Sequence, residues 1–139
     1  MVENGRHWIA IVPSRPCASQ VAAGKWLYFG ERSELHSWAK KLDELIESGQ
    51  LMSAKIAQKT PGVDPVPQKP CVVCVYTPKD ADAKEQARQL ILKEFGVELS
   101  IWKSEAQTQA DWAPGGSLRE EYEVTIGQMR DEFGEQNLQ

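Results

Sequence analysis

The sequence lacks any long hydrophobic run, which bears on where the protein resides. No apolar stretch approaches the roughly 20 residues that a membrane-spanning helix needs. The short apolar run near the amino terminus ends at Pro13 and has no signal-cleavage site. Cysteine is scarce too, and three residues, an odd number, provide no disulfide framework of the kind on which small secreted domains depend. We therefore expect a cytoplasmic protein without a membrane segment.

An excess of positive charge is also missing. The chain has 16 Lys and Arg against 20 Asp and Glu, a formal net charge of -4. Proteins that hold nucleic acid by bulk attraction carry a basic excess on one surface. We therefore expect no bulk nucleic-acid binding, so that any anionic ligand must be held by a few local side chains.

The motifs of common phosphate, hydrolase and dinucleotide sites are absent. The chain has no G-x-x-x-x-G-K-[ST], no G-x-S-x-G and no G-x-G-x-x-G. Cys71 and Cys74 form a C-x-x-C pair, but residues three apart on a strand point to opposite faces, which disfavours a shared metal or a disulfide. No second cysteine pair or neighbouring histidine completes a zinc site. We expect neither a metal nor a cofactor.

What the sequence does contain is enough for one folded domain. Its 139 residues fall within the usual size of a domain, and a hydrophobic fraction of 41% can build a single core. We expect one α+β domain over residues 1–133, followed by a frayed polar tail at 134–139.

Hydrophobic periodicity predicts five strands and two helices. Apolar runs predict strands at 7–12, 24–29, 52–56, 71–77 and 99–103, and helical spacing between caps predicts helices at 33–49 and 80–96. Four prolines predict a long loop at 58–70. After residue 107 we expect less regular structure. Residues 120–126 fit a strand or a helix, and we favour a strand followed by a short helix. Two helices cannot cover both faces of such a sheet, so we expect both on one face and the other partly open.

Alternation along the strands separates a helix-facing set of side chains from an outward set. If Leu27 and Phe29 face the helices, their neighbours in the same strand face away. In the strand at 99–103, Leu99 and Ile101 are assigned to the helix-facing set in the same way. The predicted outward face then carries Trp26, Tyr28, Lys55, Tyr76 and Trp102.

Such a face has the composition of a ligand platform. Exposed rings stack on nucleic-acid bases, each contributing on the order of 1 to 3 kcal/mol, and lysines such as Lys55 and Lys103 balance phosphate. The alternative is that the carboxyl-terminal part covers this face and that the rings are ordinary core residues. The reactive candidates are the strand-end lysines Lys25, Lys55 and Lys103, if burial lowers the pKa of one of them. In an enzyme, Lys55 or Lys103 would be the base, and His36, which we expect to face solvent, or His7 would be the acid.

Four segments resemble a known family. GKWLYF (24–29), SAKIA (53–57), CVVCVYT (71–77) and IWKSEAQT (101–108), together with Trp38, resemble the basophilic-leukaemia-expressed protein family of eukaryotes and bacteria. The resemblance implies a fold similar to the cap-binding translation initiation factor 4E, a curved, mostly antiparallel sheet with two main helices on one face. In cap-binding proteins, tryptophans sandwich a methylated base and basic residues hold its phosphates. Some family members are labelled phosphothreonine lyases, which use a lysine base and a histidine acid.

One principal hypothesis and two alternatives follow. The principal hypothesis is a non-enzymatic binding module for a nucleotide-like or phosphorylated ligand. One alternative is a phosphothreonine lyase-like enzyme with Lys55 or Lys103 as its base, and the other is a peptide-binding domain that uses the same face. In the principal hypothesis the rings stack on the ligand and the lysines supply charge, so the binding residues are Trp26, Tyr28, Lys55, Tyr76, Trp102 and Lys103.

Overall fold

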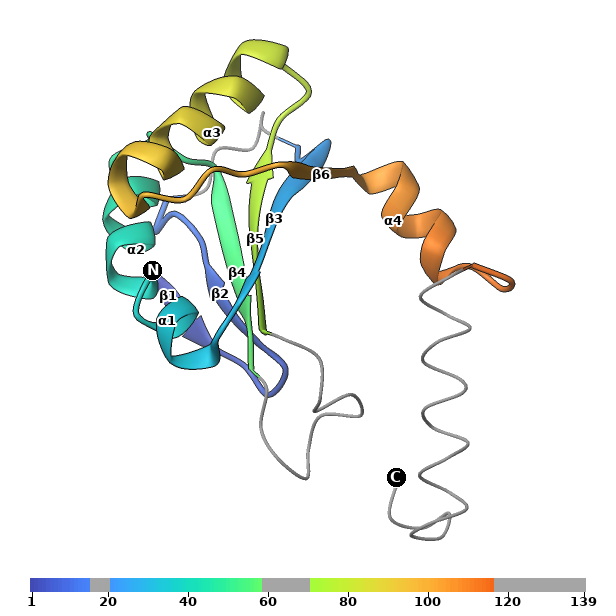
Figure 1. Cartoon of the computed structure of the whole chain (residues 1–139), viewed down its shortest axis with the longest axis horizontal. Coiled ribbons are helices and arrows are strands. Elements are labelled where there is room, and N and C mark those ends of the chain that lie inside the picture. Colours follow the sequence, from blue (N-terminus) through green and yellow to red (C-terminus); the bar gives the residue numbers. More distant parts are fainter. Residues whose placement is uncertain (16–20, 59–70, 117–139) are drawn as a thin grey trace, which may run out of the picture.

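A six-stranded antiparallel sheet forms the centre of the protein. The computed structural model describes residues 1–15, 21–58 and 71–116 of the chain. The strands are β1 (Val2–Asn4), β2 (Trp8–Ile11), β3 (Gly24–Gly30), β4 (Ser53–Ala57), β5 (Cys71–Thr77) and β6 (Ile101–Ser104). They lie in the order β1-β2-β4-β5-β3-β6, and every neighbouring pair is antiparallel (Figure 1). The α+β class with an open, curved antiparallel sheet is therefore as expected.

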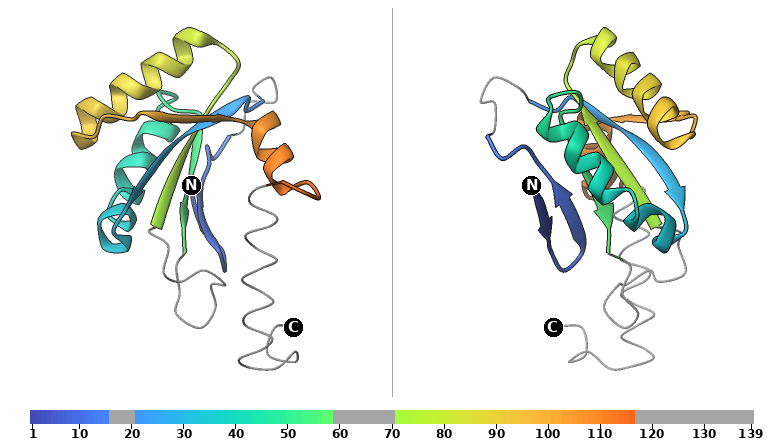
Figure 2. Two further views of the ribbon diagram at one scale, coloured as in Figure 1. Left: turned by 45° about the vertical axis from the view of Figure 1, so that its right-hand side comes forward. Right: turned by 90° about the vertical axis from the view of Figure 1, so that its left-hand side faces the viewer.

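The helices divide between the two faces of this sheet. Helices α1 (Arg32–His36), α2 (Ala39–Glu47) and α3 (Ala81–Phe95) lie on one face, whereas α4 (Glu105–Trp112) lies on the other face beside β6, as both figures show (Figures 1 and 2). We call the face under α1–α3 the inner face and the opposite one the outer face. The core fills the inner face, where the fully buried side chains include Ile11, Leu35, Leu42, Ile46, Ile56, Val73, Val75 and Ile91.

The two predicted helices are present with one difference. Helix α3 begins after Asp80, whose carboxylate accepts a hydrogen bond from the Asp82 amide at 2.8 Å, and ends at Gly96 in the left-handed conformation. The predicted helix at 33–49 is divided into α1 and α2. The helix narrows to a 3₁₀-type turn at Ser37, whose amide donates to the Ser33 carbonyl at 3.2 Å and to the Glu34 carbonyl at 3.1 Å. Helix α2 then starts after Trp38.

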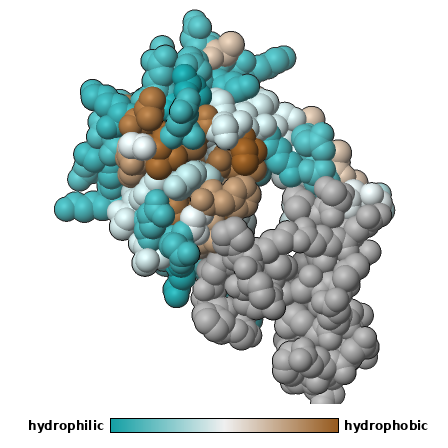
Figure 3. All heavy atoms as spheres, viewed as in Figure 1, coloured by the Kyte–Doolittle hydropathy of each residue, from teal (hydrophilic) through white to brown (hydrophobic). Residues whose placement is uncertain are grey.

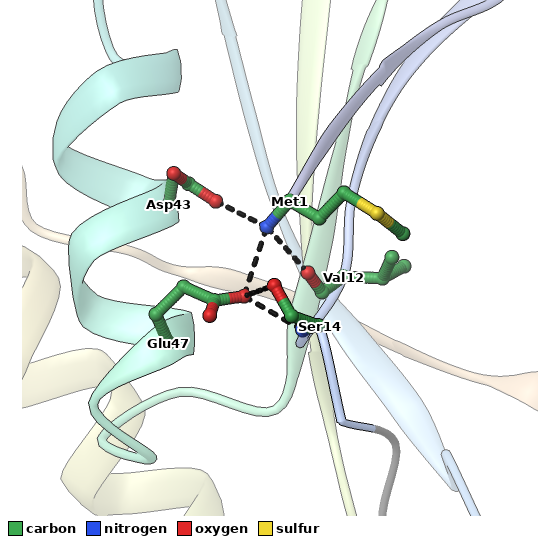
Figure 4. Close-up of polar contacts among 5 residues, drawn as sticks. All are labelled: Met1, Val12, Ser14, Asp43 and Glu47. Carbon is green, nitrogen blue, oxygen red and sulfur yellow. Dashed lines mark hydrogen bonds and ion pairs between the residues drawn. The ribbon is translucent and has the colours of Figure 1, made fainter.

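Ion pairs and hydrogen bonds connect the amino-terminal hairpin of β1 and β2 to α2. The amine of Met1 donates to the Val12 carbonyl at 2.8 Å and to Glu47 at 3.0 Å, and it also pairs with Asp43 (Figure 4). Glu47 in turn accepts hydrogen bonds from the amide and hydroxyl of Ser14 at 2.7 and 2.9 Å.

Strand β1 was not predicted, because all three of its residues are exposed and show no apolar alternation.

Some expectations lie outside the described residues. These are most of the loop predicted at 58–70, the strand at 120–126 with its following helix, and the tail at 134–139. Within the described ranges, α4 was not predicted, and the strand expected at 99–103 is observed at Ile101–Ser104. No helix in these ranges is both long and apolar enough to cross a membrane.

Candidate ligand-binding face

Three of the aromatic residues expected on the open face lie on the inner face instead. The register pairs Trp26 with Val75 and Tyr28 with Val73, and both valines are fully buried under the helices. Trp102 pairs with Trp26 and shares its face. The predicted outward orientation of Trp26, Tyr28 and Trp102 is therefore wrong.

Ring size explains why Trp26 and Tyr28 turn inward. Trp26 is buried, and its indole N–H donates to the carbonyl of Lys84 in α3 at 3.0 Å. Tyr28 stacks on Trp38 with ring centroids 5.3 Å apart, and Trp38 stacks on Phe95 at 4.2 Å. These broad rings fill the space between the sheet and the helices, and they bury more apolar area than Leu27 and Phe29 would. Phe29, expected inside, is 47% exposed.

Trp102 is held inward by its own set of contacts. Its indole N–H donates to the Thr77 hydroxyl at 3.2 Å, and the ammonium of Lys84 lies 3.9 Å from its ring centre. The ring lies directly over Gly24, where an added Cβ would come within 2.2 Å of it. The orientation of this strand was predicted wrongly because Leu99 was used to assign it. Leu99 is buried, but it precedes the first residue of β6, so its orientation does not fix that of Ile101.

The outer face carries a different cluster, which we call the lysine face. Lys55 and Tyr76 lie on it as expected, and the register pairs Lys25 with both Tyr76 and Lys103 on the same face. Trp8 joins them from β2, because Ile9 and Ile11 on either side of Ala10 point inward. The lysine face thus consists of Trp8, Lys25, Lys55, Tyr76 and Lys103.

Lys55 is the centre of the lysine face. Its ammonium lies 3.9 Å from the Trp8 ring centre and 5.9 Å from that of Tyr76, while the ammonium of Lys25 lies 5.6 Å from the Tyr76 ring on the neighbouring strand. These are cation–π contacts, which attract a charge without neutralising it. None of the ion pairs in the described part of the chain includes Lys55.

Burial changes the acid–base properties of this cluster. Loss of hydration lowers the pKa of Lys55, and the charge of Lys25 lowers it further. Burial raises the pKa of the Tyr76 hydroxyl, which therefore stays protonated and can donate a hydrogen bond. Burial also raises the pKa of the Cys74 thiol, which pairs in register with Lys55. Cys74 is therefore a neutral packing residue under the lysines.

Two carboxylates of α4 lie against the lysine face. Glu105 is 3.9 Å from the ammonium of Lys25, whose side chain is only 10% exposed. Asp111, two turns further along α4, forms an ion pair with Lys103. Three lysines therefore meet two acidic side chains, which leaves this face with an excess of one positive charge.

The remaining chemical candidates lie apart from the lysine face. His36, expected to be solvent-facing, is half-buried on α1 at the inner face, where its Nε2 lies 3.0 Å from the Ala57 carbonyl. The structure therefore does not bring His36 together with Lys55 or Lys103. Cys71 and Cys74 point to opposite faces, and both are buried. The described residues contain no group of three His, Cys, Asp or Glu side chains arranged to hold a metal.

A cleft of about 640 Å³ opens beside the lysine face. It lies where β2 ends and β4 begins, between the last turn of α2 and the first turns of α3. Arg15, Gln50 and Gln86 give it polar walls. It reaches the lysine face through Ser53 and Tyr76, which are register partners on β4 and β5.

Sequence reasoning missed Trp8, and it named Lys25 as a strand-end lysine without placing it on the outward face. The alternation in Trp8–Ile11 contained the signal for Trp8, because the two isoleucines mark the inner side of that strand. Lys25 was not placed on this face because the sequence analysis assigned the opposite orientation to the strand at 24–29.

Several large apolar side chains of the described residues are exposed at the surface. Figure 3 shows brown apolar areas among hydrophilic side chains on the side that displays α3 and β6. Leu92 of α3 and Ile101 of β6 are 43% and 48% exposed.

In comparisons with known proteins, no family model, no curated protein and no solved structure matches this chain.

Proposed function

We propose that this protein is a binding module for a nucleotide-like or phosphorylated ligand, and that the ligand binds on the lysine face. The observation that carries the proposal is the Lys55 ammonium, which is partly buried between two aromatic rings and has no carboxylate partner in the described part of the chain. A cation that is partly stripped of water and not neutralised gains strongly from an anion.

The surrounding charges support a phosphate in particular. Lys25, Lys55 and Lys103 come from three strands but share one face, so that the face offers several positive charges to the phosphates of one ligand. Each charge-assisted hydrogen bond of this kind contributes roughly 1.5 to 3 kcal/mol. The protein as a whole has a net charge of -4, so this attraction is local to the face.

The two rings support a ligand that also has a flat group. Trp8 and Tyr76 stand on either side of Lys55, on the outer strands of the β2-β4-β5 group. A nucleobase stacked on such a ring gains on the order of 1 to 3 kcal/mol. Compared with the face expected from the sequence, the proposed binding residues keep Lys55, Tyr76 and Lys103, and Trp8 and Lys25 replace Trp26, Tyr28 and Trp102.

The relationship to the basophilic-leukaemia-expressed protein family, and through it the fold of translation initiation factor 4E, is part of the proposal. The four sequence blocks carry it, and an open antiparallel sheet backed by helices on one face is what it implies. His36 does not support the lyase alternative, because it lies on the inner face and the lysine bases lie on the outer face. The other candidate acid, His7, is exposed and precedes β2.

Calorimetric titration with adenosine diphosphate and with pyrophosphate tests the proposal. We expect binding by the wild-type protein and an affinity at least about tenfold lower for Lys55→Met, because a charge-assisted contact is lost. Lys40→Met is the matched control, since Lys40 is exposed on α2 at the other side of the sheet and its loss should not change the affinity. Equal loss in both variants, or no binding by the wild type, would overturn the proposal.

A further inference from the structure

The position of Glu105 is fixed by the end of the sheet. Its amide donates to the Ala23 carbonyl at 2.8 Å, which continues the pairing of β6 with the start of β3. Ser104 then caps α4, because its hydroxyl accepts the Gln107 amide at 3.0 Å. The chain therefore turns into a helix at the point where the Glu105 side chain lies next to Lys25.

The carboxylate of Glu105 is held in an unfavourable way. Its Oε1 atom is buried and makes no hydrogen bond, and its distance of 3.9 Å from the Lys25 ammonium is too long for one. A buried acceptor without a donor costs free energy that a solvated one does not. The charge of Glu105 also acts on Lys55, where it opposes the lowering of that pKa. Glu105 thus contributes the negative charge that the lysine cluster attracts, but without good hydrogen-bond geometry.

Helix α4 is attached to the sheet mainly through its charged groups. None of the eight residues of α4 is buried, and the main contacts of α4 with the sheet are made to β3 and β6. Its second attachment on the lysine face is the pair of Asp111 with Lys103. The side chains of these two pairs are only 10 to 34% exposed, so charge attraction holds them together, and another anion can replace a carboxylate only by taking its place against the lysine.

From these contacts we propose that α4 is an internal competitor for the lysine face. Glu105 and Asp111 occupy positions that an anionic ligand needs, and a bound phosphate group displaces them and lifts α4 from the sheet. This inference rests on the proposed function, since it concerns the occupancy of the same face. Because the ligand must first displace α4, the wild-type protein binds an anionic ligand with lower apparent affinity than the same lysines would if α4 did not cover them.

Pyrophosphate titration of charge-neutralised variants tests this competition. We expect Glu105→Gln, which keeps the size of the side chain, to bind pyrophosphate about fivefold or more tightly than the wild type. Asp111→Asn should shift the affinity in the same direction. Glu98→Gln is the matched control, because Glu98 is exposed and pairs with Arg88 of α3, away from the lysine face. Its affinity should stay that of the wild type.

Hydrogen exchange supplies a second measurement that does not depend on the variants. Saturating pyrophosphate should speed exchange of the amides of α4 in the wild-type protein while the amides of α3 keep their rates. Unchanged or weaker binding by Glu105→Gln, or unchanged exchange in α4, would overturn the competition even if Lys55→Met abolishes binding and the proposed function stands. Absence of pyrophosphate binding in the wild type and in both neutralised variants would overturn the competition and the proposed function together.

Discussion

The ammonium of Lys55 lies 3.9 Å from the centre of the Trp8 ring, although the two residues come from different strands and are 47 positions apart in the chain. The pairing of Ala10 with Lys55 brings them together, because it places β2 beside β4. A ring face attracts the ammonium without neutralising it. Trp8 therefore positions the charge of Lys55 and offers a stacking surface beside it.

Replacement of this ring should affect two kinds of ligand differently. In Trp8→Leu, we expect the affinity for adenosine diphosphate to fall by about tenfold, because a base-stacking contact is lost. Pyrophosphate has no ring, so its affinity should fall by less. Calorimetry with the two ligands measures the difference, and equal losses would contradict a stacking role for Trp8.

The lowered pKa of Lys55 predicts a pH dependence of stability. Because burial makes the folded-state pKa lower than the unfolded one, the cost of burying the charge is fully present below the folded-state pKa. That cost is relieved as the pH rises from the folded-state pKa to the ordinary pKa of lysine. We therefore expect any stability advantage of Lys55→Met at neutral pH to narrow over this alkaline window. Urea unfolding at several pH values checks this, and a constant difference would argue against it.

The contact between Gly24 and Trp102 predicts a loss of stability on adding one methyl group. In Gly24→Ala, the new Cβ would lie 2.2 Å from the indole, so the ring must move away from the Thr77 hydroxyl. Overpacking of this kind costs about 1 to 3 kcal/mol of unfolding free energy. Gly30→Ala is the matched control, because its nearest neighbour is the flexible carboxylate of Glu34 at 3.2 Å. Urea unfolding should show a clearly smaller loss for Gly30→Ala than for Gly24→Ala.

Glu47 predicts an acid-sensitive attachment of the amino-terminal hairpin. Hydrogen bonds from the Met1 amine and from Ser14 lower the pKa of its carboxyl group, so the attachment holds above the unfolded-state pKa and is lost as the pH falls through the folded-state pKa. In Glu47→Gln, the Ser14 amide should exchange faster at neutral pH, and the difference from wild type should disappear in acid. Glu44→Gln, exposed on the same helix, should behave as wild type; faster exchange there would contradict the assignment.

Much of the fold could be predicted because the local signals agree with the tertiary structure. The cap at Asp80, the glycine at 96 and the stripe through Ala87 and Ile91 all specify one helix, and α3 has those bounds. Alternation in β4 correctly separated Ala54 and Ile56, which are buried on the inner face, from Lys55 on the outer face. Sequence patterns of this kind depend on neighbours in the chain, which the sequence shows directly.

The orientation of β3 could not be predicted in the same way. In that strand the side chains on both faces are apolar or aromatic, since Trp26 and Tyr28 alternate with Leu27 and Phe29. Alternation separates the sets but does not say which one the helices cover. The choice depends on how much space α2 and α3 leave above the sheet, and this space fits indole and phenol rings. Helix α4 was missed for a simpler reason: it buries no residue and therefore has no apolar stripe.

The stack of Tyr28, Trp38 and Phe95 has a spectroscopic consequence. The three rings belong to β3, to the start of α2 and to the end of α3, and the planes of successive rings differ by only 7° and 18°. Electronic transitions of rings this close couple to one another, so near-ultraviolet circular dichroism reports whether the sheet and both helices are docked. Trp8 lies on the opposite face, outside this stack. Because five tryptophans contribute to the same spectrum, the difference between the spectra of the wild type and Trp8→Leu isolates the signal of the surface around Lys55 from that of the core.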